Sequence, residues 1–149
     1  MASTLTAVTA TITTTVSYTL GGNPYTKTFT ETVAANKDPI TQVVPVTTTA
    51  INILQVDASL GPGNLLSMRK AIFKNWDDTN VITLGFLTTG GDTLYVVLKP
   101  GDVFHFGDIR TDVNTTGAAA AALAAFTNFD TVVARADTAA CDLEFIAWA

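Results

Sequence analysis

The chain has 149 residues, of which 48% are hydrophobic and only 14% charged, with a net charge of -5. The apolar content excludes disorder as the state of the whole chain, because it is large enough to offset the loss of chain entropy on folding. The acidic balance argues against nucleic acid as a partner, since phosphate-backbone binding needs clustered Lys and Arg.

The cysteine count and the apolar runs limit the redox chemistry and the location of the chain. Cys141 is the single cysteine, which excludes an intramolecular disulfide and a CxxC motif, and we expect it to be buried in the last strand. The first residues lack the charged and apolar regions of a signal peptide. The longest run of apolar and glycine residues, 117–126, is too short to cross a bilayer. The sequence therefore predicts a protein made in the cytoplasm that has no membrane partner.

The first segment alternates between apolar and hydroxyl-bearing residues. From position 8 to position 20 every even residue except Thr14 is apolar, and every odd residue is Thr or Ser. A period of two predicts a long strand with one buried face. Gly21-Gly22-Asn23-Pro24 then favours a turn, and the alternation resumes as far as Val33. We therefore predict a long N-terminal β-hairpin over residues 4–33, which acts as an arm or an oligomerisation element.

Short β-branched runs separated by turn residues fill the remaining chain. The predicted strands are 41–46, 50–56, 65–73, 81–87, 93–98, 103–109, 131–136 and 142–148. Pro45 restricts the first of these to a sheet edge or a bulge, and Pro100-Gly101 predicts a type II turn. The alanine-rich segment 117–125 is read either as a short helix or as an irregular connection.

These elements give eight to ten strands with a turn signal about every ten residues, and no alternation of strands with helices. The pattern predicts an all-β fold, a β-sandwich with a jelly-roll-like arrangement of strands. No internal repeat and no linker divides the sequence, so we expect a single domain over residues 1–149.

The best candidate for a metal-binding segment is Pro100–Phe106, which is similar to the turn and strand of the cupin metal motif. Metal binding needs several converging ligands, and His105 is the single histidine of the chain. We therefore interpret His105 as a half-buried residue beside a tight turn. A cupin-like metalloenzyme is kept as a remote alternative.

The sequence gives no clear motif for other kinds of catalytic site either. The chain has no Gly-x-Ser-x-Gly elbow, and most aspartates fall at turns, where turn chemistry explains them. Asp77 and Asp78 lack the spacing of a known calcium loop. The cluster of Arg69, Lys70 and Lys74 is interpreted as a solvated strand face. We therefore predict a protein that is not an enzyme, with no catalytic residue, cofactor or metal ligand.

A threonine-rich surface with few charges is typical of proteins that pack against copies of themselves or against a larger assembly. Threonine favours extended backbone and keeps a hydroxyl for a partner. Trp76, in a polar turn, is a further candidate because an exposed indole can stack on a sugar or fill a partner's pocket. The candidate interaction residues are Thr9, Thr11, Thr13, Thr26, Thr28, Thr30 and Trp76.

The second half of the chain carries a set of short motifs. They are KNWDDTNVITLG at 74–85, LKPGD at 98–102, ARAD at 134–137 and LEFIA at 143–147. In these motifs residues 65–149 resemble small structural proteins of tailed-phage virions, which decorate or cement capsids or build necks and tails. The N-terminal hairpin is outside the resemblance, and no functional residue is carried over, because the role of that group lies in its surfaces.

The resemblance implies a non-enzymatic capsid decoration or cement protein that is located in the virion. Its partner would be the major capsid protein or another virion protein, and we expect a homo-oligomer, with a trimer considered first. The alternative is a neck, tail or fibre module that binds a carbohydrate receptor, which an exposed aromatic platform at Trp76 would favour.

Overall fold

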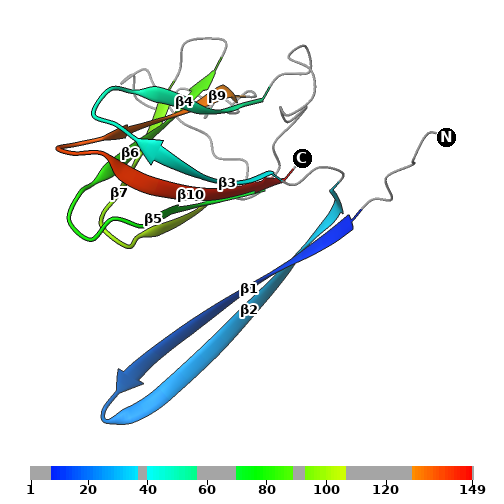
Figure 1. The fold of residues 1–149 in the computed structure, drawn as a ribbon. Coiled ribbons are helices and arrows are strands. Elements are labelled where there is room, and N and C mark those ends of the chain that lie inside the picture. The colour runs from blue at the N-terminus through cyan, green and yellow to red at the C-terminus, as the bar shows by residue number, and fades with distance from the viewer. Residues whose placement is uncertain (1–7, 37–39, 57–69, 89–92, 107–128, 149) are drawn as a thin grey trace, which may run out of the picture. The chain divides into compact units, whose positions relative to one another are not determined.

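The computed structural model describes residues 8–36, 40–56, 70–88, 93–106 and 129–148, and the regular elements in these ranges are all strands (Figure 1). The chain divides into two compact units, Met1–Asp38 and Pro39–Ala149. Within the described ranges, no helix is long and apolar enough to span a membrane. The all-β prediction is confirmed.

The first unit is the predicted hairpin, formed by β1 (Val8–Leu20) and β2 (Asn23–Asn36) in antiparallel pairing (Figure 1). Gly21 and Gly22 both have positive φ, +58° and +84°. Two such residues make the two-residue turn whose twist matches that of the flanking strands, and glycine takes this conformation without a steric penalty. The turn fixes the register of the pairs from Leu20–Asn23 to Ala10–Val33, and the register shifts between Ala10 and Val8.

The alternation of the hairpin was expected to give one buried face, and this expectation is wrong. Val16, Tyr18 and Leu20 on the apolar face are 45%, 53% and 64% exposed, and the opposite strand leaves Tyr25 and Phe29 exposed as well. The reason is that two strands provide no second layer to cover either of their faces.

The described residues of the second unit form a β-sandwich, with eight strands in two antiparallel sheets (Figure 1). The strands are β3 (Ile40–Val46), β4 (Ile51–Gln55), β5 (Lys70–Asn75), β6 (Ile82–Thr88), β7 (Thr93–Leu98), β8 (Val103–Phe106), β9 (Phe129–Ala136) and β10 (Cys141–Trp148). One sheet has the order β3-β10-β5-β8 and the other β4-β9-β6-β7. The pairings β3–β10, β4–β9, β5–β8 and β6–β7 are nested, each inside the one before.

The core lies between the two sheets and is rich in phenylalanine. Phe73 on β5 and Phe86 on β6 meet edge to face across the sandwich, with ring centroids 5.7 Å apart, and both are fully buried. Phe145 on β10 packs 6.0 Å from Phe73. Edge-to-face pairs of this kind add to the stabilisation from buried apolar area.

Several strand predictions agree closely with the structure. β7 has the predicted bounds, and β3, which carries Pro45, lies at a sheet edge as expected. Gly101 has φ +75° and the Asp102 N–H donates to the Lys99 carbonyl at 3.0 Å, as a type II turn requires.

Two predictions need correction. The strand expected at 65–73 is observed as β5, which continues to Asn75, because the polar Asn75 pairs with Leu143 and is buried rather than starting a turn. Lys70 is 5% exposed, so it does not belong to a solvated face. Arg69 and the segments 65–69, 107–109 and 117–125 lie outside the described residues.

Candidate interaction surfaces

One face of the hairpin is a ladder of hydroxyl groups, which we call the threonine face. The register pairs Thr11 with Thr32, Thr13 with Thr30, Thr15 with Thr28 and Ser17 with Thr26. The Thr15 and Thr28 hydroxyl oxygens lie 3.4 Å apart, and those of Ser17 and Thr26 lie 3.3 Å apart. The hairpin therefore brings together the six threonines predicted as interaction residues, Thr9, Thr11, Thr13, Thr26, Thr28 and Thr30, and all of them are exposed.

The opposite face is apolar, and its exposed side chains contact one another across the strands. The rings of Tyr18 and Tyr25 stack with centroids 5.4 Å apart and an interplanar angle of 14°. The Lys27 ammonium lies 5.1 Å from the centre of the Phe29 ring, a cation–π contact. We call this the apolar face, and it presents aromatic and aliphatic surface where the threonine face presents hydroxyl groups.

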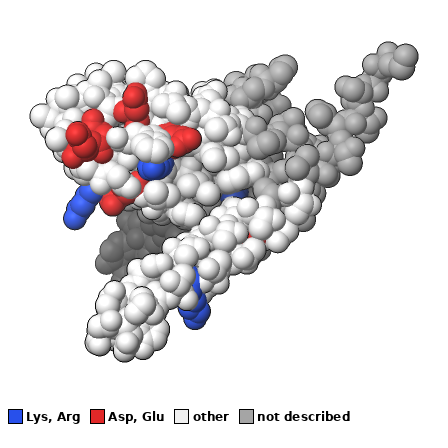
Figure 2. Space-filling view, turned by 60° about the horizontal axis from the view of Figure 1, so that its bottom comes forward, with Lys and Arg blue, Asp and Glu red and all other residues white. Residues whose placement is uncertain are grey.

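Only two charged residues occur between positions 8 and 36, Lys27 and Glu31, and both belong to the apolar face. Lys27 is opposite Val16 and Glu31 is opposite Ile12 in the register. Charged side chains are correspondingly sparse on the hairpin, while acidic ones gather on one side of the second unit (Figure 2). A charge-poor arm favours contacts made by packing and by neutral hydrogen bonds.

On the second unit, Trp76 is an exposed aromatic residue that directly follows β5. Its side chain is 55% exposed, and the indole N–H donates to the Glu144 carboxylate at 2.7 Å. The Lys74 ammonium lies 3.1 Å from the centre of the ring. These two contacts hold the indole in one orientation at the surface, so the prediction that Trp76 can meet a partner is compatible with its position.

The loop after Trp76 is organised by Asp77. One carboxylate oxygen of Asp77 accepts hydrogen bonds from the Thr79 N–H at 2.7 Å and from the Asn80 N–H. It also accepts from the Thr79 hydroxyl and the Asn80 side-chain amide. These donors favour the charged carboxylate and lower the pKa of Asp77 to about 2. All four of these hydrogen bonds go to the same oxygen of Asp77, Oδ1.

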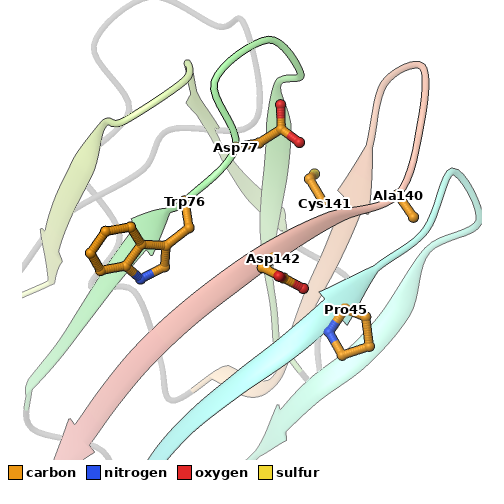
Figure 3. A pocket seen from close by; sticks show the side chains of 6 residues that line it. All are labelled: Pro45, Trp76, Asp77, Ala140, Cys141 and Asp142. Carbon is orange, nitrogen blue, oxygen red and sulfur yellow. The ribbon is translucent and has the colours of Figure 1, made fainter.

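A shallow pocket of about 200 Å³ opens beside this loop (Figure 3). It is lined by Pro45, Trp76, Asp77, Ala140, Cys141 and Asp142. The two carboxylates can accept hydrogen bonds from the hydroxyl groups of a ligand, and the indole supplies an apolar edge. Burial raises the pKa of the Cys141 thiol, and the charges of Asp77, Asp137 and Asp142 raise it further. A thiol in this setting is a poor nucleophile.

His105 is placed on β8, opposite Ile72, and it is exposed rather than half-buried. The correction follows from the sheet order, since β8 is an edge strand and His105 points away from the sandwich core. Across the described ranges, no group of three or more His, Cys, Asp or Glu side chains is arranged to hold a metal ion.

Sequence reasoning predicted the threonines and Trp76 as contact residues and did not consider the apolar face as a surface for contacts. The signal was present, because a two-residue turn at Gly21-Gly22 places Lys27 and Glu31 on the same side as Val16 and Tyr18.

Comparison of the chain with models of protein families, with curated proteins and with solved structures gives no significant match.

Proposed function

We propose that this chain is a non-enzymatic structural protein of a virion, one that decorates the capsid shell and stabilises it. The observation that carries the proposal is the hairpin, whose threonine face and apolar face are both exposed along its two strands. Exposed contiguous apolar surface marks a site of association, and the row of neutral hydroxyl groups on the other face can bond a partner without burying a charge. A two-stranded sheet is also marginally stable alone, so partners that cover its faces would stabilise the arm.

Two further features support this role. The motifs of residues 74–147 resemble those of small virion proteins, and the nested strand pairings support the jelly-roll-like arrangement expected for the second unit. A decoration protein needs a rigid body and repeated shallow contacts, and the sandwich and the hairpin fit these needs. The partner under this proposal is the major capsid protein or another virion protein, and the chain acts as a homo-oligomer in the virion.

The experiment is cosedimentation of the full chain with purified capsid shells, with shell stability measured by heating. We expect saturable binding at a fixed ratio to capsid subunits and a higher temperature for shell opening. Thr28→Asp, on the threonine face, is expected to weaken binding, because it adds a charge to a surface of neutral hydroxyl groups. Thr48→Asp, at an exposed position of the sandwich, is the matched control. Absence of binding to every shell tested would contradict the proposal.

A second candidate function is carbohydrate binding by a neck, tail or fibre module, and Trp76 is the observation that favours it. The exposed indole of Trp76 lies next to the Asp77 and Asp142 carboxylates. A sugar ring can stack on such an indole while its hydroxyl groups donate hydrogen bonds to the carboxylates. Titration with a glycan panel, followed by indole fluorescence, tests it. Binding should be lost in Trp76→Ala and kept in Tyr95→Ala, which removes another exposed aromatic.

A further inference from the structure

The apolar face of the hairpin has a charge pattern that is complementary to itself, and this identifies its occupant. We propose that a second copy of this chain covers the face, with the two hairpins antiparallel and related by a two-fold axis that passes beside Phe29. The homo-oligomer of the proposed function would then associate through the apolar face as a two-fold pair, in place of a trimer. This pairing depends on the hairpin alone.

The register sets which residues would meet. Same-face residues of one strand are about 7 Å apart, so Lys27, Phe29 and Glu31 form an evenly spaced row on β2. A two-fold axis perpendicular to the strands, placed at Phe29, brings the Phe29 rings of both copies together. The same axis places Lys27 of each copy opposite Glu31 of the other. Two symmetric ion pairs then flank an aromatic contact.

The facing strand agrees with this arrangement. Thr14 is opposite Phe29 in the hairpin and therefore lies at the same axis. Val16 of one copy then meets Ile12 of the other, two β-branched apolar side chains. Thr14, the one threonine in the even-numbered series of β1, thus contacts its own symmetry mate, and the aliphatic residues beside it contact each other.

The other face-to-face arrangement, with parallel hairpins, is disfavoured by the same register. An axis along the strands would place β1 of one copy over β2 of the other. Lys27 would then lie on Val16, and Glu31 on Ile12, so neither residue would meet an opposite charge of the other copy. Complementary charges across an interface favour the register that brings them together. The antiparallel pair is the arrangement that matches both charges.

The size of the face predicts how tight the pair is. Residues 12–20 of β1 span about 30 Å at the usual strand rise, and two strands are about 10 Å wide, so each copy offers roughly 300 Å² of projected face. That is small beside a standard interface of about 800 Å² for each partner. Association of the free protein is therefore expected to depend on concentration, and many copies held on one shell would strengthen it.

The test is charge reversal measured by analytical ultracentrifugation of the full chain over a wide concentration range. Lys27→Glu and Glu31→Lys should each weaken self-association by about tenfold or more, because each places two like-charged pairs in the interface. A 1:1 mixture of the two variants should associate again, because every contact between the different chains then joins opposite charges. The double variant, with both charges reversed, should recover the association of the unaltered chain.

Thr28→Glu is the matched control, since it adds a charge to the same strand on the threonine face and should leave the association unchanged. Circular dichroism of each variant checks that the hairpin is retained. An unaltered chain that is monomeric at every concentration would overturn the proposal, and so would single variants that associate normally or a mixture that stays dissociated. Shell binding is measured separately, so that failure of the pair is distinguished from failure of the decoration function.

Discussion

The side-chain nitrogen of Asn75 lies 3.2 Å from the carbonyl oxygen of Leu98, so a fully buried amide ties the end of β5 to the end of β7. The same nitrogen donates to the carbonyl oxygens of Asn80 and Lys99 at 2.9 and 3.2 Å. The Asn75 side-chain oxygen accepts from the Asp77 N–H at 3.0 Å. The Asn75 side chain therefore connects the loop that follows Trp76 to the Pro-Gly turn that begins at Lys99.

Replacement of Asn75 by alanine is expected to destabilise the sandwich strongly. Asn75→Ala removes a fully buried donor and acceptor together, takes a hydrogen bond from the carbonyl group of buried Leu98 and leaves a cavity, so the free energy of unfolding should fall by about 2–4 kcal/mol. Urea unfolding followed by circular dichroism measures this. Asn52→Ala, which removes an exposed amide on β4, should change the value by less than about 0.5 kcal/mol. Equal effects of the two substitutions would contradict the role of Asn75.

A second prediction concerns Gly85 in the central strand β6. A Cβ atom at this position would lie 2.8 Å from Val133 Cγ2, closer than real contacts allow, and 3.3 Å from Tyr95 Cε1, which is tighter than most real contacts. Gly85→Ala should therefore lower the free energy of unfolding by about 1–3 kcal/mol. Val133→Ala in the same chain removes the closest atom, so the double variant should be more stable than the sum of the single effects indicates. Simple additivity would show that Val133 is not the cause.

The hairpin and most of the strands could be predicted because their causes are local. The alternation of β1 and the glycine pair at 21–22 specify two strands, a turn and a register without reference to any distant residue. Pro45 likewise excluded β3 from the centre of a sheet, because proline has no backbone N–H to donate to a second neighbouring strand. A period of two, however, states which residues share a face, and says nothing about what covers that face. This is why exposed Tyr18 was expected to be buried.

The features that could not be predicted depend on pairing between distant segments. The place of Asn75 inside the sheet is set by Leu143 on β10 and by the carbonyl groups that follow β7, which are remote in sequence. Asparagine in a sequence signals a turn, so β5 was expected to end too early. The hydrogen bond between Trp76 and Glu144 likewise requires the β5–β10 pairing.

The depressed pKa of Asp77 predicts an acid-dependent loss of stability. Its pKa is about 2 in the folded chain, against an ordinary 3.8, because the Asn80 and Thr79 N–H groups stabilise the charged form. The unfolded chain therefore binds the proton more tightly. The stabilisation is complete above the unfolded pKa and is lost as the pH falls from 3.8 towards 2.

Urea unfolding between pH 5 and pH 2 measures this effect. The midpoint should fall with pH more steeply in the unaltered chain than in Asp77→Ala, which lacks the carboxylate at every pH. Some slope should persist in the variant, because the Val81 N–H lowers the pKa of Asp137 as well. Identical slopes in the two proteins would show that the Asp77 hydrogen bonds do not persist in solution.

The last prediction is that Cys141 reacts slowly with thiol reagents although it lines a pocket. Its side chain is 5% exposed, and burial together with the neighbouring carboxylates raises the pKa of its thiol, so little of the reactive thiolate forms near neutral pH. With a disulfide reagent at pH 8, the folded chain should react on the order of 100-fold more slowly than the chain in urea. Cys141→Ser gives the background rate. Equal rates in the folded and unfolded chain would mean that β10 opens at this end faster than the reagent attacks, and that the pocket is not a stable feature of the surface.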